Sequence, residues 1–141
     1  MPTDQGGRVR LADFAGRKVV VYFYPADNTP GCTLEAVDFS KARAAFQRAG
    51  TDIVGISPDG ETSHDKFKAK HGIGIALASD TERKTIKAYG AWGEKVMFGR
   101  KYMGVERATF LIGPDGKIAQ EWRKVRVPGH VAAVLAAAKA L

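Results

Sequence analysis

The single cysteine of this 141-residue chain, Cys32, stands in the segment Thr29-Pro30-Gly31-Cys32. A free cysteine is more often a buried, unreactive apolar residue than a catalyst. Here, however, Thr29 and Pro30 are typical of a helix N-cap and of the first helical position. They would place the sulfur in the first turn of a helix, where partial positive charge and unpaired N–H groups favour thiolate over thiol. The segment therefore predicts a nucleophilic cysteine.

Two further residues could serve such a thiolate. Gly31 has no side chain to block the approach of a small substrate to the backbone, although simple turn geometry explains a glycine there as well. Arg107 directly precedes an apolar segment at residues 108–112, and a cation at the start of a buried strand needs a partner. A thiolate across the sheet would supply that partner, but from the residues alone this argument is weak.

Metal chemistry fits the sequence poorly. The histidines fall in separate predicted elements, and none has a metal-ligand spacing to another or to Cys32. We expect neither a metal nor an organic cofactor. We interpret all three histidines as surface polar residues: His64, His71 and His130.

Strand and helix patterns alternate along the chain and must position these residues. Apolar, β-branched and aromatic runs predict strands, and apolar residues at helical spacing predict helices. The strands are expected at residues 19–24, 52–56, 75–78, 108–112 and 117–122, and the helices at 30–50, 62–70, 81–89 and 130–140. This order predicts a thioredoxin-like α/β fold in one domain, residues 1–141, with a mixed central sheet flanked by helices.

Cys32 follows the strand expected at residues 19–24. Sites in open sheets of this kind gather at the carboxyl ends of the strands, so the position of Cys32 favours a functional role. Residues 91–106 carry several apolar side chains without a clean period, and we expect an irregular connection there. A functional loop and an ordinary covering loop remain equally open for this segment.

Composition narrows the choice of partners. The net charge is +7, from 22 basic and 15 acidic residues, but the basic residues are spread along the chain. We therefore expect a solvated basic face and no nucleic-acid partner. No apolar run approaches the roughly 18 residues of a membrane span, and residues 1–10 lack the apolar stretch of a signal peptide. A cytoplasmic location without a membrane partner is the expectation.

Two segments carry a resemblance to a known family. Residues 22–36, YFYPADNTPGCTLEA, strongly resemble the active-site segment of peroxiredoxins, most closely the bacterioferritin comigratory protein (Bcp or PrxQ) subfamily. Pro25, Thr29 and Cys32 match the Pro-x-x-x-Thr-x-x-Cys spacing of that family. Residues 104–112, GVERATFLI, resemble its arginine-bearing strand. The resemblance covers nearly the whole chain, and the two motifs in this order are highly specific.

The resemblance implies a thiol-dependent peroxidase for hydrogen peroxide and alkyl hydroperoxides. In that mechanism the Cys32 thiolate attacks the terminal peroxide oxygen and becomes a sulfenic acid. Thr29 would hydrogen-bond the sulfur and the peroxide, and Arg107 would hold the thiolate and stabilise charge as the O–O bond breaks. Pro25 would shield the sulfenic acid, and the N–H groups of Gly31 and Cys32 would orient the peroxide. We further expect the apolar residues of 91–106 to admit bulky organic peroxides.

The chain departs from the family where relatives carry a resolving cysteine, because Val37 and Lys68 stand at those positions. We therefore expect a monomeric one-Cys enzyme reduced by thioredoxin, by glutaredoxin with glutathione, or by another small thiol. A transient Cys32–Cys32 dimer is another route. The alternative function is a non-enzymatic redox sensor or thioredoxin-like binding module oxidised at Cys32. The family usually has an initial strand before the point that residues 1–5 resemble, and without it we expect uncovered core or edge surface.

Overall fold

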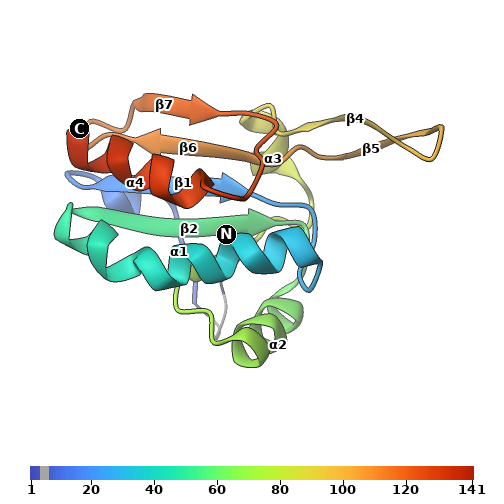
Figure 1. Ribbon diagram of the computed structural model, residues 1–141, viewed down its shortest axis with the longest axis horizontal. Coiled ribbons are helices and arrows are strands. Elements are labelled where there is room, and N and C mark those ends of the chain that lie inside the picture. Colours follow the sequence, from blue (N-terminus) through green and yellow to red (C-terminus); the bar gives the residue numbers. More distant parts are fainter. Residues whose placement is uncertain (4–6) are drawn as a thin grey trace.

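The computed structural model, which describes residues 1–3 and 7–141, has a mixed β-sheet at its centre (Figure 1). The strand order is β3-β2-β1-β6-β7, in which the first three strands are parallel and β6 and β7 are antiparallel to their neighbours. The bounds are β1 Lys18–Phe23, β2 Thr51–Ser57, β3 Ala76–Ser79, β6 Ala108–Ile112 and β7 Ile118–Trp122. The predicted mixed sheet is confirmed, with small shifts at the strand ends.

Helices cover both faces of the sheet. α1 (Pro30–Arg48) and α4 (His130–Ala140) lie side by side over one face, and α2 (Glu61–His71) packs beside β3 (Figure 1). α3 (Lys84–Ala88) contributes Ile86 to the core cluster on the opposite face. The thioredoxin-like α/β arrangement expected from the order of elements is therefore confirmed.

β1 shows why this sheet needs cover on both sides. Val20 and Tyr22 join the core cluster that includes α1 and α4, whereas Val19, Val21 and Phe23 join the cluster on the α3 face. Successive side chains of a strand point to opposite faces, so a run that is apolar at every position must lie between two layers. β1 is thereby held in the middle of the sheet, and its carboxyl end leads into the loop before α1.

The helix expected at residues 81–89 is shorter than predicted, because α3 begins only at Lys84. Arg83 adopts a left-handed conformation with φ 63°, and its N–H donates to the Asp80 carbonyl oxygen, which closes a turn. The Asp80 carboxylate accepts from the Ile86 N–H at 2.8 Å instead of capping a helix that begins at residue 81. Residues 81–83 separate the aspartate from the helix.

The expectation of an irregular segment at residues 91–106 is wrong. This segment forms the two-stranded hairpin of β4 (Trp92–Met97) and β5 (Arg100–Val105), which projects from the body of the molecule (Figure 1). The hairpin pairs with itself and does not join the main sheet. Its apolar residues are adjacent in sequence, such as Val96 with Met97, so they do not alternate as in a strand with one buried face.

The amino-terminal segment packs against the β3 edge of the sheet. Thr3 bridges to Ala78, and the Ser79 N–H donates to the Pro2 carbonyl oxygen at 2.8 Å. A hollow of about 670 Å³ lies on the α3 face, and Val9, Phe14 and Tyr89 are among the residues that line it. Residues 4–6 lie outside the described part of the chain. In that described part, every helix is too short or too polar to cross a membrane.

Candidate active site

Cys32 lies in the first turn of α1, directly after the loop that leaves β1. Thr29 occupies the N-cap with extended backbone angles, and Pro30 is the first helical residue, as the sequence predicts. The sulfur is therefore at the third helical position, beside the carboxyl end of β1. The Cys32 side chain is buried, at 1% exposed. The thiol is therefore shielded from bulk solvent.

Arg107 reaches the sulfur from the start of β6, the strand that pairs with β1, where Ala108 lies opposite Phe23. It lies between β5 and β6, and its Nη2 donates to Cys32 Sγ at 3.1 Å. Its Nη1 donates to Glu35 Oε1 at 2.6 Å. The guanidinium is thus anchored by a carboxylate and presented to the sulfur at the same time. The juxtaposition of Cys32 and Arg107, for which the residues alone gave a weak argument, is present in the structure.

Glu35 is a site residue that the sequence analysis missed. It is completely buried on α1, three residues after Cys32, and therefore on the same side of the helix. Burial raises the pKa of Glu35 to about 7, although the charge and hydrogen bond of Arg107 act in the opposite direction. Its Oε2 has no hydrogen-bond partner among the described residues, which limits how far Arg107 offsets the burial. The sequence signal that could have identified Glu35 is an acidic residue three positions after a cysteine in a predicted helix.

Gly31 and Thr29 have contacts that differ from the expected ones. A Cβ at position 31 would lie 3.3 Å from Arg107 Nη2, so glycine leaves room for the guanidinium as well as for a substrate. The Thr29 hydroxyl donates to the Ala26 carbonyl oxygen at 2.9 Å and makes no capping hydrogen bond. The N–H groups of Gly31 and Cys32 therefore receive no cap from Thr29. Pro25 is half-buried in the same loop.

A buried polar network holds the loop that carries Pro25 and Thr29. His64 Nδ1 lies 2.8 Å from Asp27 Oδ2, and the two side chains are 0% and 2% exposed. Tyr24 and Ser63 also donate to the Asp27 carboxylate, at 2.6 and 2.7 Å. His64 Nε2 lies 3.1 Å from the Ala78 carbonyl oxygen. With an acceptor at each ring nitrogen, His64 is placed to be an imidazolium that ties α2 and β3 to Asp27.

The pKa shifts of this pair agree with the geometry. Burial acts to lower the pKa of His64, but the hydrogen bond and charge of Asp27 outweigh it and raise this pKa above its ordinary value. Burial likewise acts to raise the pKa of Asp27, but hydrogen bonds from His64, Tyr24 and Ser63 lower it overall. Both shifts favour the charged pair around neutral pH.

We expect the free energy of unfolding to fall as pH rises from about 6.5 through the folded-state pKa of His64. The folded protein holds this proton more tightly than the unfolded chain, so the stabilisation is complete at lower pH and lost as the ring deprotonates. Urea unfolding from about pH 6 to 9 measures it. Asp27→Asn should remove the His64 part of the decline, whereas His71→Gln should retain it. An unchanged decline in Asp27→Asn would contradict this account.

The interpretation of all three histidines as surface residues is wrong for two of them. His64 is 0% exposed because both ring nitrogens have partners, and His130 is 7% exposed. His130 Nε2 lies 2.8 Å from Thr109 Oγ1, and burial lowers the pKa of His130 to about 4. Within residues 1–3 and 7–141, no cluster of three or more histidine, cysteine, aspartate and glutamate side chains is arranged to hold a metal ion.

A thioredoxin-like sheet that presents an arginine-held cysteine at the start of a helix defines a thiol peroxidase of the peroxiredoxin class. Residues 1–121 match the AhpC/TSA family, and the chain belongs to that family. It is 47% identical over 132 residues to Peroxiredoxin Bcp of Bacillus subtilis, covering 94% of this chain and 84% of that protein. It is 37% identical to Peroxiredoxin Bcp of Escherichia coli, covering 96% and 86%.

Solved structures give the same result. Peroxiredoxin Q of Xanthomonas campestris superposes with a TM-score of 0.94 at 45% identity, covering 99% of this chain and 88% of that chain. A structure concerned with alkyl peroxide reduction by the bacterioferritin comigratory protein of the same organism matches with the same TM-score of 0.94. The chain is therefore a thiol-dependent peroxidase that acts on a hydroperoxide and is reduced by a thiol.

Proposed function

We propose that Cys32 is the thiol that reduces the hydroperoxide and that the enzyme follows a one-Cys cycle with an external reductant. The observation that carries the proposal is the 3.1 Å contact from Arg107 Nη2 to Sγ of the only cysteine in the chain. A guanidinium at this distance stabilises a thiolate and remains in place as negative charge moves to the peroxide.

The chemical step follows from this arrangement. The Cys32 thiolate attacks the terminal peroxide oxygen, the O–O bond breaks, and the alkoxide or hydroxide leaves with a proton as alcohol or water. Cys32 becomes a sulfenic acid, oxidised by two electrons. We assign the N–H groups of Gly31 and Cys32 to orient the peroxide and Thr29 to hydrogen-bond it. Pro25 shields the sulfenic acid.

Recycling needs thiols from outside the chain. Where members of this family carry a resolving cysteine, this chain has Val37 on α1 or Lys68 on α2. Neither residue supplies a second sulfur. An external thiol displaces the sulfenic oxygen as water to form a mixed disulfide with Cys32, and a second thiol then releases the reduced enzyme. We propose a monomer with one domain over residues 1–141, reduced by thioredoxin or by glutaredoxin with glutathione. The cytoplasm, where such thiols are kept reduced, is the fitting compartment.

A cavity beside Arg107 supports the use of alkyl hydroperoxides. It measures about 510 Å³ and lies between the loop of Pro25 and the base of the β4–β5 hairpin. Trp92 and Val125 give it apolar walls next to the Arg107 guanidinium. An alkyl group in this cavity would place its peroxide end toward the guanidinium and the first turn of α1. The Xanthomonas campestris relative concerned with alkyl peroxide reduction supports the same substrate class.

The test compares kcat/KM for cumene hydroperoxide and hydrogen peroxide with thioredoxin, glutaredoxin or glutathione as reductant. We expect turnover with at least one reductant and none in Cys32→Ser. Val125→Asp should lower kcat/KM for cumene hydroperoxide about tenfold and leave hydrogen peroxide within about twofold, with Val125→Thr as the control of similar shape. A large preference for hydrogen peroxide would refute the alkyl substrate. Fast Cys32 oxidation without turnover on any reductant would favour the redox sensor.

A further inference from the structure

The end of the β4–β5 hairpin exposes an unusual amount of apolar surface. Phe98, in the turn, is 97% exposed, and its neighbours Val96 and Met97 are 65% and 54% exposed. Met103 on the opposite strand is also 54% exposed, but it lies farther from the turn, where it pairs with Glu94. We call Val96, Met97 and Phe98 the hairpin tip. Because the hairpin projects away from the main sheet, the body of the molecule does not cover its tip (Figure 1).

The turn itself is unfavourable for the residue that occupies it. Phe98 and Gly99 connect the strands with φ of 52° and 76°, the left-handed conformation of a type I′ turn. Asparagine or aspartate suits the first of these positions, whereas a bulky aromatic residue there is strained. The chain therefore keeps a strained and fully exposed phenylalanine that contributes nothing to its own core. This combination points to a contact outside the chain.

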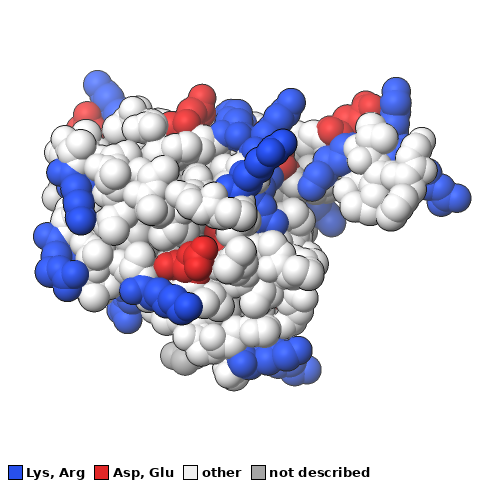
Figure 2. All heavy atoms as spheres, in the orientation of Figure 1, with Lys and Arg blue, Asp and Glu red and all other residues white. Residues whose placement is uncertain are grey.

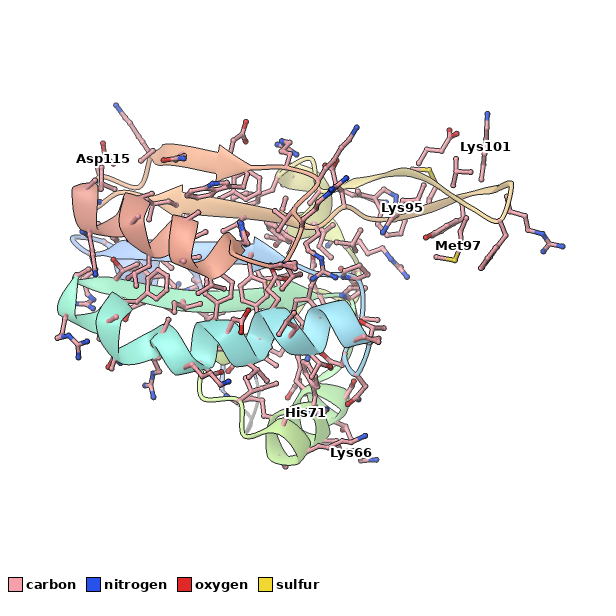
Figure 3. All side chains as sticks on the ribbon, viewed as in Figure 1. Lys66, His71, Lys95, Met97, Lys101 and Asp115 are labelled. Atoms are coloured by element: carbon pink, nitrogen blue, oxygen red, sulfur yellow. The ribbon has the colours of Figure 1, made fainter. Side chains whose placement is uncertain are left out.

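The apolar side chains of the tip point in more than one direction. Val96 pairs with Lys101, and Met97 pairs with Arg100, in the register of the hairpin. Paired residues share a face and successive residues alternate, so Val96 and Met97 lie on opposite faces. Figure 3 shows Met97 and Lys101 on opposite sides of the hairpin. A flat protein surface would cover one face only, whereas a lipid layer surrounds an inserted tip on all sides.

Two basic residues, Arg100 and Lys101, flank this apolar tip on β5, and Figure 2 shows side chains of their class beside a white end. Lys101 Nζ lies 3.7 Å from the Glu94 carboxylate, and Lys95 Nζ donates to the Val105 carbonyl oxygen at the base of the hairpin. The whole chain carries a net charge of +7. Long basic side chains can reach lipid phosphates while apolar neighbours insert below them, and anionic lipids attract such segments.

We propose that the β4–β5 hairpin is a surface anchor that inserts its tip among the headgroups of an anionic lipid bilayer. Such an anchor is a peripheral contact and needs no membrane-spanning segment. It departs from the expectation, drawn from the composition, that the protein has no membrane partner. β4 lines the cavity beside Arg107 from Trp92 up to the tip residue Val96, so binding would bring that cavity close to the lipid. The anchor itself does not depend on the proposed one-Cys cycle.

Co-sedimentation of the full chain with vesicles tests the anchor. We expect binding to vesicles of phosphatidylcholine with phosphatidylglycerol, weak binding to pure phosphatidylcholine, and weakening by salt. Phe98→Asn suits the left-handed turn and should keep the hairpin folded, yet lower the vesicle affinity about tenfold or more. Ile118→Thr, which removes an exposed apolar residue on β7, is the matched control and should bind as the unmodified chain does.

Three results would overturn the anchor. One is the absence of binding to anionic vesicles at low salt. Another is equal binding by Phe98→Asn, because adhesion would then come from net charge alone. The third is a loss of self-association or of thioredoxin-dependent turnover in Phe98→Asn without a change in vesicle binding, which would assign the tip to a protein partner. Lipid-dependent quenching in Phe98→Trp by brominated acyl chains should report insertion directly.

Discussion

Arg107→Ala will slow the oxidation of Cys32 by hydrogen peroxide about a hundredfold to a thousandfold, the usual effect of removing a charge-stabilising donor. Arg107 Nη2 is 3.1 Å from Sγ, so the substitution removes the cation that holds the thiolate and stabilises the leaving oxygen in the proposed mechanism. Stopped-flow measurement of the second-order rate constant, with circular dichroism to verify folding, gives the answer. A rate within about threefold of the unmodified chain would remove Arg107 from the reaction.

Two further variants separate charge from geometry in this prediction. Arg107→Lys keeps a positive charge but cannot donate from two fixed positions to Glu35 and Cys32 together, so we expect an intermediate rate. Arg17→Ala removes an exposed arginine that pairs with Asp52 at the opposite end of β1. Arg17→Ala should oxidise Cys32 at the same rate as the unmodified chain. That result would show that loss of a surface arginine does not by itself slow the oxidation.

Glu35→Ala will lower the free energy of unfolding by about 3 kcal/mol, because it leaves the Arg107 guanidinium without its carboxylate partner. The Glu35 side chain is fully buried and that of Arg107 is 16% exposed. As Glu35 anchors Arg107, the variant should also slow Cys32 oxidation about tenfold through the loss of positioning. Urea unfolding and stopped-flow oxidation measure the two effects. Equal stability and equal rate in Glu35→Ala would contradict the anchoring role.

Glu35→Gln tests the charge of this anchor separately. The amide oxygen can still accept from Arg107, so the oxidation rate should stay within about threefold of the unmodified chain. Burial raises the pKa of Glu35 to about 7 in the folded protein, above its ordinary value of 4.5. The folded state therefore binds the proton more tightly, and stability should fall as pH rises between these values. Glu35→Gln should lose this decline, whereas the His64 decline at higher pH should remain.

The position of Cys32 could be predicted because local patterns determine it. Thr29 and Pro30 mark the start of α1, and a strand that is apolar on both faces can only be central. These signals depend only on neighbouring residues and on the spacing of apolar residues, so they can be recognised without knowledge of tertiary contacts. Arg107 was identified from two motifs together, and the strand order then brings β6 beside β1.

Glu35, Asp27 and His64 could not be recognised in the same way. Their roles depend on partners distant in sequence, such as Arg107 for Glu35 and the Ala78 carbonyl oxygen for His64. A polar residue in an amphipathic pattern is normally assigned to the surface. Only the contacts in the folded protein show that such a residue is buried with hydrogen-bond partners. The β4–β5 hairpin was missed for a related reason. Its strands have exposed residues on both faces, so apolar and polar residues do not alternate along their sequences.

The most direct test of the central claim follows Cys32 itself during one turnover. The reduced protein is mixed with an equimolar amount of hydroperoxide and a sulfenic-acid trap, and stopped-flow and mass spectrometry follow the product. We predict rapid formation of one Cys32 sulfenic-acid adduct per chain, far faster than for a free thiol and strongly slowed in Arg107→Ala. Oxidation at the rate of an ordinary thiol would contradict the assignment of Cys32 as the peroxide-reducing residue.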